Sequence, residues 1–386
     1  MKVLIAMSLA AAHDYGVALG AALGKRTHTV IYAAGGIAAE MLARSGTAYL
    51  SGKPEQVMDA VRPNVFIACI AGGGKDAEPI EIALAQEANE RNIPWTLMED
   101  TAGVASQPAF TDMLWSHHPA LVCLTDQSSA DRFKLTHPEI PEGDVEVVGN
   151  PTWDAALRVD RGVVRQAASD SLGLSRTDYL VVYMAGKVGG VERTRAVLEP
   201  LVRSLCAIDQ DRRYHCWLAP LFHSGDPEWR ATLEQGGSPY GCFDPVLTQA
   251  KQQAGLGLIS KVEIAEKFGT DLVPVLAAAD AFVSTASADN TRAVLLRTPV
   301  IRPLFPLDRK MLETLGYESP HYFSDVALGC SLAAYSELGL LAALDALLAP
   351  NASTRRLMRE NQALHFSAPG DSITDRIVEM LEHLVK

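Results

Sequence analysis

Residues 178–208, DYLVVYMAGKVGGVERTRAVLEPLVRSLCAI, contain the pattern that decides the fold of this chain. The run YLVVYM carries no charge, which is typical of a strand that is buried on both faces of a sheet. A glycine-rich loop follows it, and then a long segment with apolar residues at helical spacing. A strand, a short glycine loop and a helix in this order predict one crossover unit of a parallel sheet.

The same unit recurs on both sides of this stretch. Strand-like apolar runs are expected near residues 2–8, 28–34, 64–70, 94–100, 120–126 and 144–148, and again near residues 214–220, 255–261, 280–284 and 298–303. Between the two groups lies VVGNPTWDAALR at residues 147–158, where a Gly-Asn-Pro sequence ends a strand before a helix begins.

This alternation predicts an α/β fold with two doubly wound Rossmann-like domains facing a central cleft. The expected domains are residues 1–152 and residues 153–370. Residues 371–386 are expected to form a C-terminal helix that crosses back to the first domain.

Composition excludes several classes of protein. The chain of 386 residues has a formal net charge of −12, which argues against a general nucleic-acid binder because phosphate neutralisation needs surplus Lys and Arg. No stretch reaches about 18 consecutive apolar residues, so no transmembrane span is predicted. Its six cysteines include no CxxC pair, which favours free thiols in a reducing cytoplasm and argues against a metal site. We expect a cytoplasmic protein that acts on small polar substrates.

Polar residues that follow the strands are the candidates for chemistry, because doubly wound sheets bind ligands at the carboxyl ends of their strands. His13 and Asp14 follow the first strand, where a histidine can titrate near neutrality and a carboxylate can deprotonate a hydroxyl. Asp14 would serve equally well as a helix cap. Glu99 and Asp100 end another strand, and paired carboxylates can share a proton or bind a hydroxylated substrate. We predict His13, Asp14 and Asp100 as catalytic residues.

The second half offers candidate substrate-binding residues. Gly186 and Lys187 lie in the glycine loop, and Arg193 lies in the opening turns of the next helix, where backbone amides and cations would hold a diphosphate. The loop is not a Walker motif, because the GK[ST] ending is missing. His223 follows the next strand, although a Ser-Gly-Asp-Pro turn explains that segment equally well. A later strand and helix start supply hydroxyl and amide side chains suited to an anion and a sugar, namely Ser284, Thr285, Asn290 and Thr291.

The hinge GNPTWDA (residues 149–155), the glycine loop and STASADNTRAVLLRTPVI (residues 284–301) make the chain resemble the GT-B superfamily. That superfamily includes nucleotide-sugar glycosyltransferases and UDP-N-acetylglucosamine 2-epimerases, and GNPTWDA is similar to the hinge GNT-x-x-DA of the epimerases. The resemblance implies an acceptor in the first domain, a nucleotide-sugar donor in the second, and no required metal or bound cofactor. It also implies a base at His13 or Asp14, a donor-phosphate loop at Gly186 and Lys187, and nucleotide contacts at His223.

The sequence departs from this pattern at Asn290 and Thr291, where most members carry a glutamate that binds the ribose or the donor sugar. Epimerase chemistry depends on several carboxylates including that one, whereas a transferase needs a base and a diphosphate site. We therefore expect a glycosyltransferase that moves a sugar from a nucleoside-diphosphate donor to an acceptor hydroxyl in a polysaccharide or natural-product pathway. A sugar-nucleotide epimerase and a non-catalytic sugar-nucleotide binding protein are the alternatives. The acceptor stays open, and a homodimer is one assembly to consider.

Overall fold

The computed structural model describes residues 1–71, 80–100, 103–107, 110, 118–185, 190–212, 215–221, 240–269, 271–287, 289–314, 323–366 and 372–385. The chain divides into two compact units. Unit 1 comprises Met1–Ala155 together with Ala368–Lys386, and unit 2 comprises Ala156–Ser367. The C-terminal segment therefore belongs to the same unit as the N-terminus.

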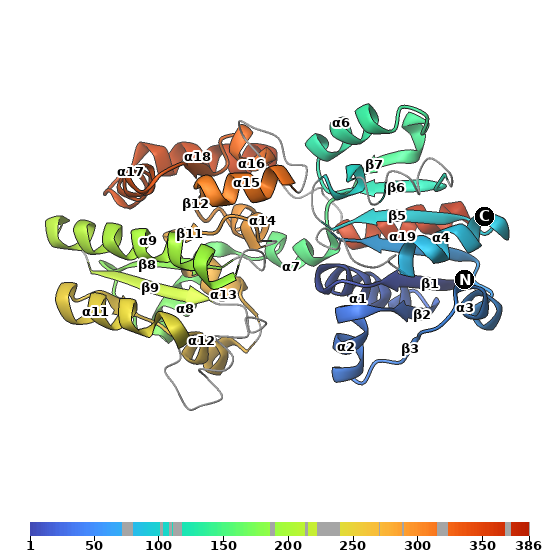
Figure 1. The fold of residues 1–386 in the computed structure, drawn as a ribbon, viewed down its shortest axis with the longest axis horizontal. Coiled ribbons are helices and arrows are strands. Elements are labelled where there is room, and N and C mark those ends of the chain that lie inside the picture. The colour runs from blue at the N-terminus through green and yellow to red at the C-terminus, as the bar shows by residue number, and fades with distance from the viewer. Residues whose placement is uncertain are drawn as a thin grey trace. The chain divides into compact units, whose positions relative to one another are not determined.

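Unit 1 is built on a seven-stranded sheet with the order β3-β2-β1-β4-β5-β6-β7, in which every pair of neighbours is parallel (Figure 1). The strands are β1 (Lys2–Met7), β2 (Thr29–Ala34), β3 (Tyr49–Leu50), β4 (Val65–Ile70), β5 (Trp95–Glu99), β6 (Leu121–Leu124) and β7 (Val145–Val147). The chain reverses its winding direction between β1 and β4. Such a switch point opens a crevice at the carboxyl ends of the two strands.

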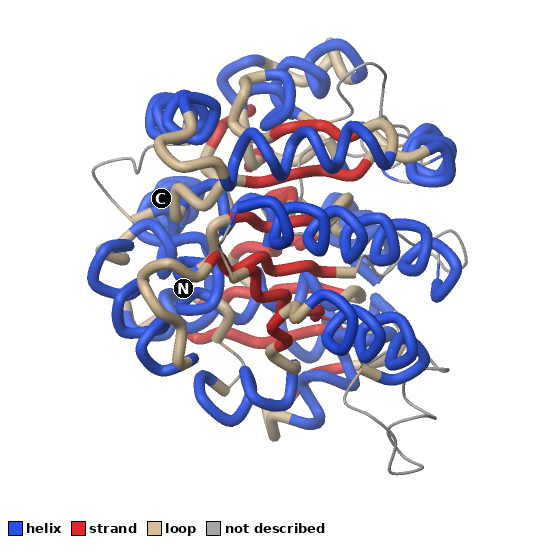
Figure 2. The backbone as a smooth tube through the Cα atoms, turned by 90° about the vertical axis from the view of Figure 1, so that its left-hand side faces the viewer, coloured by secondary structure: helices blue, strands red, loops and turns tan. Residues whose placement is uncertain are grey.

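Helices cover both faces of this sheet. Figure 2 shows strands, in red, lying between layers of helices, in blue. One face is covered by α1 (Ala10–Lys25), α2 (Gly36–Arg44) and α19 (Ile373–Leu384). The other is covered by α3 (Pro54–Val61), α4 (Ile80–Glu90) and α6 (Gln127–Thr136), which pack their apolar residues on Phe66, Leu97 and Val122. Helices on both faces explain why the strands read as continuous apolar runs rather than as alternating ones.

Unit 2 repeats the plan with a six-stranded sheet of order β10-β9-β8-β11-β12-β13, again parallel throughout. The strands are β8 (Tyr179–Met184), β9 (Cys216–Leu221), β10 (Gly257–Leu258), β11 (Ala281–Val283), β12 (Val300–Pro303) and β13 (Leu332–Ala334). Its switch point lies between β8 and β11, where Val182 pairs with Phe282.

The helices of unit 2 also form two layers. One layer contains α9 (Gly190–Arg212), α11 (Asp244–Ala254) and α17 (Glu337–Leu348), which bury Val181, Val283 and Ile301. The other contains α8 (Arg161–Leu172), α13 (Val273–Ala278) and α14 (Asp289–Leu295), and α18 (Ser353–His365) packs against α14 and α17. Shorter helices complete the chain, namely α7 (Asp154–Leu157), α12 (Lys261–Phe268), α15 (Pro306–Thr314) and α16 (Ser324–Ala327).

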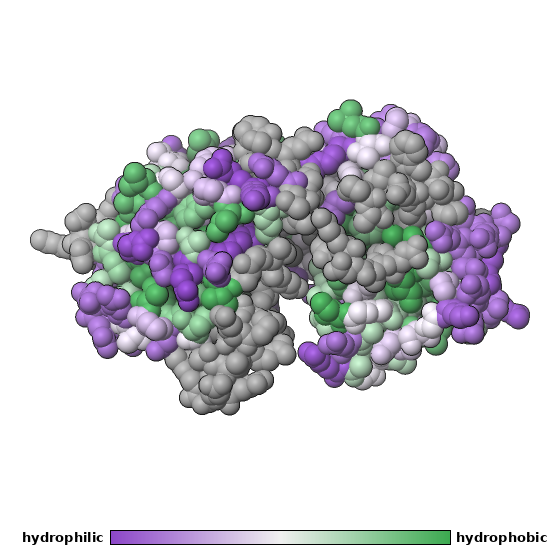
Figure 3. All heavy atoms as spheres, in the orientation of Figure 1, coloured by the Kyte–Doolittle hydropathy of each residue, from purple (hydrophilic) through white to green (hydrophobic). Residues whose placement is uncertain are grey.

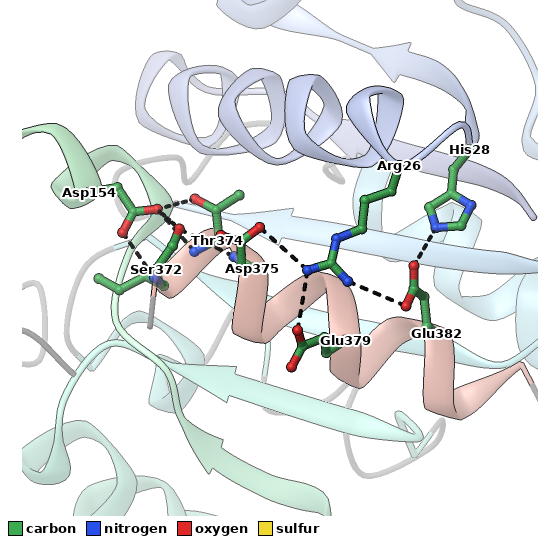
Figure 4. Close-up of polar contacts among 9 residues, drawn as sticks. Arg26, His28, Asp154, Ser372, Thr374, Asp375, Glu379 and Glu382 are labelled. Atoms are coloured by element: carbon green, nitrogen blue, oxygen red, sulfur yellow. Dashed lines mark hydrogen bonds and ion pairs between the residues drawn. The ribbon is translucent and has the colours of Figure 1, made fainter. Parts of the chain in front are cut away.

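The start of α19 is fixed by Asp154, the aspartate of the GNPTWDA hinge (Figure 4). Its carboxylate accepts hydrogen bonds from Ser372 Oγ (2.6 Å), Ile373 N (2.9 Å) and both the backbone N and the hydroxyl of Thr374. Gly149 adopts φ +89°, and a Cβ there would lie 2.9 Å from Ile373 Cδ1. The hinge motif therefore serves a structural purpose, which is to dock α19 on unit 1.

Ion pairs hold the rest of α19 to the end of α1 and the residues that follow it (Figure 4). Arg26 reaches Asp375 (3.5 Å), Glu379 (3.2 Å) and Glu382 (3.5 Å), while His28 Nε2 lies 2.8 Å from Glu382 Oε1.

Hydrophilic side chains gather at the end of unit 1 where α3 and both chain termini lie (Figure 3). None of the helices in the described ranges combines the length and the apolar character that a membrane crossing requires.

Candidate functional site

His13 and Asp14 lie side by side in the first turns of α1, directly after β1. His13 Nδ1 is 3.0 Å from Asp14 Oδ1, and the His13 side chain is 13% exposed against 53% for Asp14. The other ring nitrogen, Nε2, is buried and has no hydrogen-bond partner within the described ranges. A carboxylate at Nδ1 favours the tautomer that carries its proton there, which leaves the lone pair on Nε2. In that tautomer, Nε2 can accept a hydrogen bond.

Glu99 ends β5 and is fully buried. Its Oε1 accepts hydrogen bonds from Ser129 Oγ (2.5 Å) and Thr125 Oγ1 (3.0 Å), and its Oε2 accepts one from the backbone N of Ala105 (3.0 Å). Burial raises the pKa of the Glu99 carboxyl to about 7, although these hydrogen bonds favour the ionised form. Glu99 can therefore carry or release a proton near neutral pH.

Asp100, the residue predicted as catalytic in this pair, is also buried at 6% exposure. Its backbone N donates to Ile70 O (3.1 Å), and its backbone O accepts from Asn150 Nδ2 (2.9 Å). Asn150 is the asparagine of the hinge motif, and its Oδ1 also accepts from Thr152. The hinge asparagine thereby fixes the backbone turn that carries Asp100.

Glu81 is a buried carboxylic acid at the same edge of the sheet that the sequence analysis did not single out. It lies in the first turn of α4, is 1% exposed, and its Oε1 accepts a hydrogen bond from Ser8 Oγ (2.8 Å) just after β1. Its Oε2 is buried without a partner in the described part of the chain. Burial raises the pKa of Glu81 to about 7. The signal that could have revealed it is an acidic residue between Ile80 and Ile82 in an apolar helical run.

In unit 2, the predicted residues Ser284 and Asn290 are both fully buried. Neither the Ser284 hydroxyl nor either polar atom of the Asn290 side chain has a hydrogen-bond partner among the described residues. Thr285 Oγ1 donates to Pro303 O (2.9 Å), and Thr291 is half-buried on α14. Buried polar groups without partners are costly in a folded protein, so Ser284 and Asn290 are candidates for contact with a polar ligand.

Arg193 lies on α9 and forms a buried ion pair with Asp308 of α15. Thr285 Oγ1 also lies 3.2 Å from Asp308, and Arg193 Nη1 lies 3.0 Å from Met311 Sδ. Asp308 neutralises much of the charge that the sequence analysis assigned to phosphate binding by Arg193. The other predicted phosphate and nucleotide contacts, Gly186, Lys187 and His223, lie outside the described residues.

Within the described ranges, no three His, Cys, Asp or Glu side chains are grouped so that they could hold a metal ion. The candidate residues lie at two sheet edges. The edge of unit 1 carries His13, Asp14, Glu81 and Glu99, and the edge of unit 2 carries Ser284 and Asn290.

No protein-family model and no curated protein sequence matches this chain. Solved structures do match it. The S. aureus MnaA–UDP co-structure superposes with a TM-score of 0.67 at 14% identity, covering 100% of this chain and 96% of that one. The UDP-GlcNAc 2-epimerase from Neisseria meningitidis bound to UDP-GlcNAc gives 0.61 at 12% identity, covering 99% and 100%. A glycosyltransferase from Rickettsia africae ESF-5 gives 0.60 at 10% identity, covering 100% and 98%.

These matches span whole chains on both sides, and each unit has the parallel, doubly wound sheet that the sequence predicts. At such low identity the likeness concerns the fold. The chain has the two-domain α/β fold of the GT-B type, shared by sugar-nucleotide epimerases and glycosyltransferases.

Proposed function

We propose that this protein is a glycosyltransferase that moves a sugar from a nucleoside-diphosphate donor to an acceptor hydroxyl. The observation that carries the proposal is the His13–Asp14 pair, with Nδ1 held 3.0 Å from a carboxylate and Nε2 buried without a partner among the described residues. An acceptor hydroxyl would supply the missing partner of Nε2 and lie where its proton can be removed.

In the proposed reaction, His13 Nε2 takes the proton of the acceptor hydroxyl as the oxygen bonds to the anomeric carbon of the sugar. The bond from that carbon to the donor phosphate breaks, and the nucleoside diphosphate leaves with the electron pair. Asp14 stabilises the imidazolium that forms, as a carboxylate does beside a catalytic histidine. The step needs no oxidant and no further reactant.

Ser284 and Asn290 are the proposed contacts of unit 2 to the donor. Their polar atoms lack partners in the described part of the chain, and hydroxyl and amide donors stabilise the negative charge of a leaving diphosphate. Gly186, Lys187 and His223 remain predicted contacts to the same group. Structural neighbours that were solved with UDP or UDP-GlcNAc bound support a uridine nucleotide as the first donor to test.

A sugar-nucleotide 2-epimerase is the second candidate, and one specific observation favours it. Epimerisation at a carbon must break a C–H bond and then form it again, so it needs a group that can both accept and donate a proton near neutral pH. Glu99, with a pKa raised to about 7 by burial, meets that requirement. Several structural neighbours are UDP-GlcNAc 2-epimerases.

One experiment separates these functions. The full chain is incubated with UDP-GlcNAc and other nucleotide sugars in D₂O, and the donor is followed by NMR and mass spectrometry. A transferase releases nucleoside diphosphate slowly without acceptor and faster with one, and leaves the sugar carbons free of deuterium. An epimerase returns an epimer that carries solvent deuterium. Thermal stabilisation by the donor with neither change would identify a binding protein and contradict both enzymatic proposals.

A further inference from the structure

Four arginines of unit 2 lie near the end of α13. They are at the opposite edge of the sheet from Ser284. Arg161 and Arg165 lie one turn apart on α8, and their guanidinium groups both donate to the backbone O of Ala279, at 3.2 Å and 3.3 Å. Ala279 lies two residues before the start of β11, so the cluster lies at the amino ends of the strands. Ser284 follows the carboxyl end of the same strand, which makes the two places distinct.

The second pair of arginines comes from α18. Arg355 Nη1 donates to Leu347 O (3.0 Å), and Arg359 Nε donates to Arg297 O (3.1 Å). Both guanidinium groups are within electrostatic range of the arginines on α8, since Arg359 and Arg355 each lower the pKa of Arg161. Neither reaches a carboxylate by an ion pair among the described residues.

In the described part of the chain, Asp280 is the carboxylate that pairs with this group of arginines. Asp280 Oδ1 lies 2.7 Å from Arg165 Nη2, and its Oδ2 accepts a hydrogen bond from Leu180 N (3.0 Å). Four guanidinium groups around the Asp280 carboxylate give this place a positive charge, in a chain whose formal net charge is −12. Such a concentration of like charge is unfavourable unless an anion balances it.

Arg161 is the group that is least satisfied. Its Nε is buried and has no hydrogen-bond partner within the described ranges, and its Nη2 donates to Ala279 O. Burial and the neighbouring cations, Arg359 first, lower the pKa of its guanidinium to about 9. A bound anion would accept hydrogen bonds from Arg161 and would raise the pKa of its guanidinium.

A pocket of about 190 Å³ adjoins Arg165 and provides room for a ligand. The face of α8 contributes Gln166 and Ser169, and the chain after α8 contributes Ser175 and Arg176. Hydroxyl, amide and guanidinium groups together supply many donors, and a planar guanidinium binds phosphate oxygens in pairs. The lining also includes Asp178 and Asp280, which suit hydroxyl groups on the remainder of a ligand.

We propose that Arg161, Arg165, Arg355 and Arg359 form a binding site for a phosphate group, separate from the donor site, with the adjacent pocket holding the rest of a small phosphorylated ligand. The site is independent of the proposed function, because none of its residues lies at the carboxyl ends of the strands.

The test is a titration of the full chain with inorganic phosphate at constant ionic strength and pH 7, read out as the melting temperature and by calorimetry. We expect a saturable rise in melting temperature that sodium chloride does not give. R161Q and R359Q should each weaken the phosphate affinity by about tenfold or more, because each removes a charge-assisted hydrogen-bond donor. The two variants lie on different helices, so one can serve if the other fails to fold.

The matched control is R356Q. Arg356 lies on α18 beside the cluster, its side chain is 79% exposed, and it is paired only loosely with Glu360 at 3.8 Å. R356Q should keep the phosphate response of the wild type. N290A, a variant at the proposed donor site, should also keep the phosphate response. If N290A loses this response while R161Q and R359Q keep it, the proposal is overturned. A wild-type protein with no saturable response would do so as well.

Glycerol 3-phosphate, tested alongside, distinguishes the source of the phosphate. Tighter binding than inorganic phosphate would assign the pocket to a phosphorylated metabolite. Weaker binding, with the same loss in R161Q, would assign the site to the free ion.

Discussion

His13 is the residue on which the proposed reaction depends most. We expect H13A to lower kcat/KM for sugar transfer by at least about 100-fold, because the acceptor hydroxyl loses its base. D14N should lower it less, since it weakens the stabilisation of the imidazolium but leaves Nε2 in place. Steady-state assays with the donor found in D₂O would measure both. H118A, at an exposed histidine of the same unit, is the control and should retain wild-type turnover.

Asn290 gives a prediction in which stability and binding change in opposite directions. Its side chain is fully buried, and neither polar atom has a partner in the described part of the chain. N290L should therefore raise the free energy of unfolding of the unliganded protein by roughly 1 kcal/mol, yet abolish stabilisation by the nucleotide.

The control for N290L is Q362L. Gln362 is equally buried, but its Nε2 donates to Thr298 O (3.0 Å) and Cys330 O (2.9 Å). Q362L should destabilise the protein, because it leaves two carbonyls without a donor. Urea unfolding with and without nucleotide measures both variants. A loss of stability in N290L as large as that in Q362L would mean that Asn290 is a structural residue.

Glu81 links stability to pH. Its pKa is raised in the folded state to about 7, so the unfolded chain binds fewer protons than the folded one between about pH 4.5 and pH 7. The stability from this group is present below its unfolded pKa and is lost as the pH rises through 7. Between pH 4 and pH 8, ionisation of Glu81 lowers the free energy of unfolding by on the order of 3 kcal/mol. E81Q should remove this pH dependence.

Chemical unfolding at several pH values would test this, with E90Q as the control because Glu90 is exposed on the same helix. Glu99 contributes a slope of the same sign, so the wild type should still lose stability towards alkaline pH in E81Q. An unchanged slope in E81Q would show that Glu81 is ionised in the folded protein at neutral pH.

At the scale of secondary structure, the docking of α19 depends on one carboxylate. D154A removes an acceptor that serves Ser372, Ile373 and Thr374, so α19 should exchange its amide hydrogens faster. The loss of a helix cap costs about 1–2 kcal/mol. Hydrogen-exchange mass spectrometry of residues 372–385 measures the effect. D160A, which removes the cap of α8 in unit 2, should destabilise the protein without this change in α19.

Most of the strands could be predicted from the sequence, but the short strands β3 (Tyr49–Leu50) and β13 (Leu332–Ala334) were missed. Six strands begin at residues 2, 29, 65, 95, 121 and 179, where apolar runs occur in the sequence. A strand that is buried on both faces has little room for a polar side chain. The parallel, doubly wound order followed from the strand–helix alternation, and the GT-B type of fold is confirmed. These features are local in sequence, so a single chain contains them.

The site was only partly predictable, for a physical reason. His13 with Asp14 are neighbours in sequence, so their pairing could be anticipated. Glu81 and Ser8, which form a hydrogen bond, lie 73 residues apart in the sequence. Arg193 and Asp308, which form an ion pair, lie 115 residues apart. Such pairs form only when strands and helices from distant segments meet, and no local pattern specifies them. The arginine cluster of unit 2 belongs to the same class.

For the whole molecule, the two units predict different behaviour when they are separated. Unit 2 is one continuous segment, Ala156–Ser367, so the fragment 156–367 should unfold cooperatively by itself. The fragment 1–155 should not, because it lacks α19, whose Ile377, Val378 and Leu381 are buried. Joining residues 368–386 to it through a flexible linker should restore a cooperative transition. Circular dichroism during thermal unfolding compares the three proteins, and cooperative unfolding of 1–155 would contradict the prediction.

The position of α19 also sets the order in which this protein can be completed during its synthesis. The helix that covers one face of unit 1 is encoded after the 212 residues of Ala156–Ser367. At about 5–20 residues per second, the ribosome needs roughly 10–40 s to reach it. During that interval the emerged N-terminal half has an uncovered apolar face beside α1, where chaperones can bind and misfolding can begin. The half of the protein that is made first is therefore the half that is finished last.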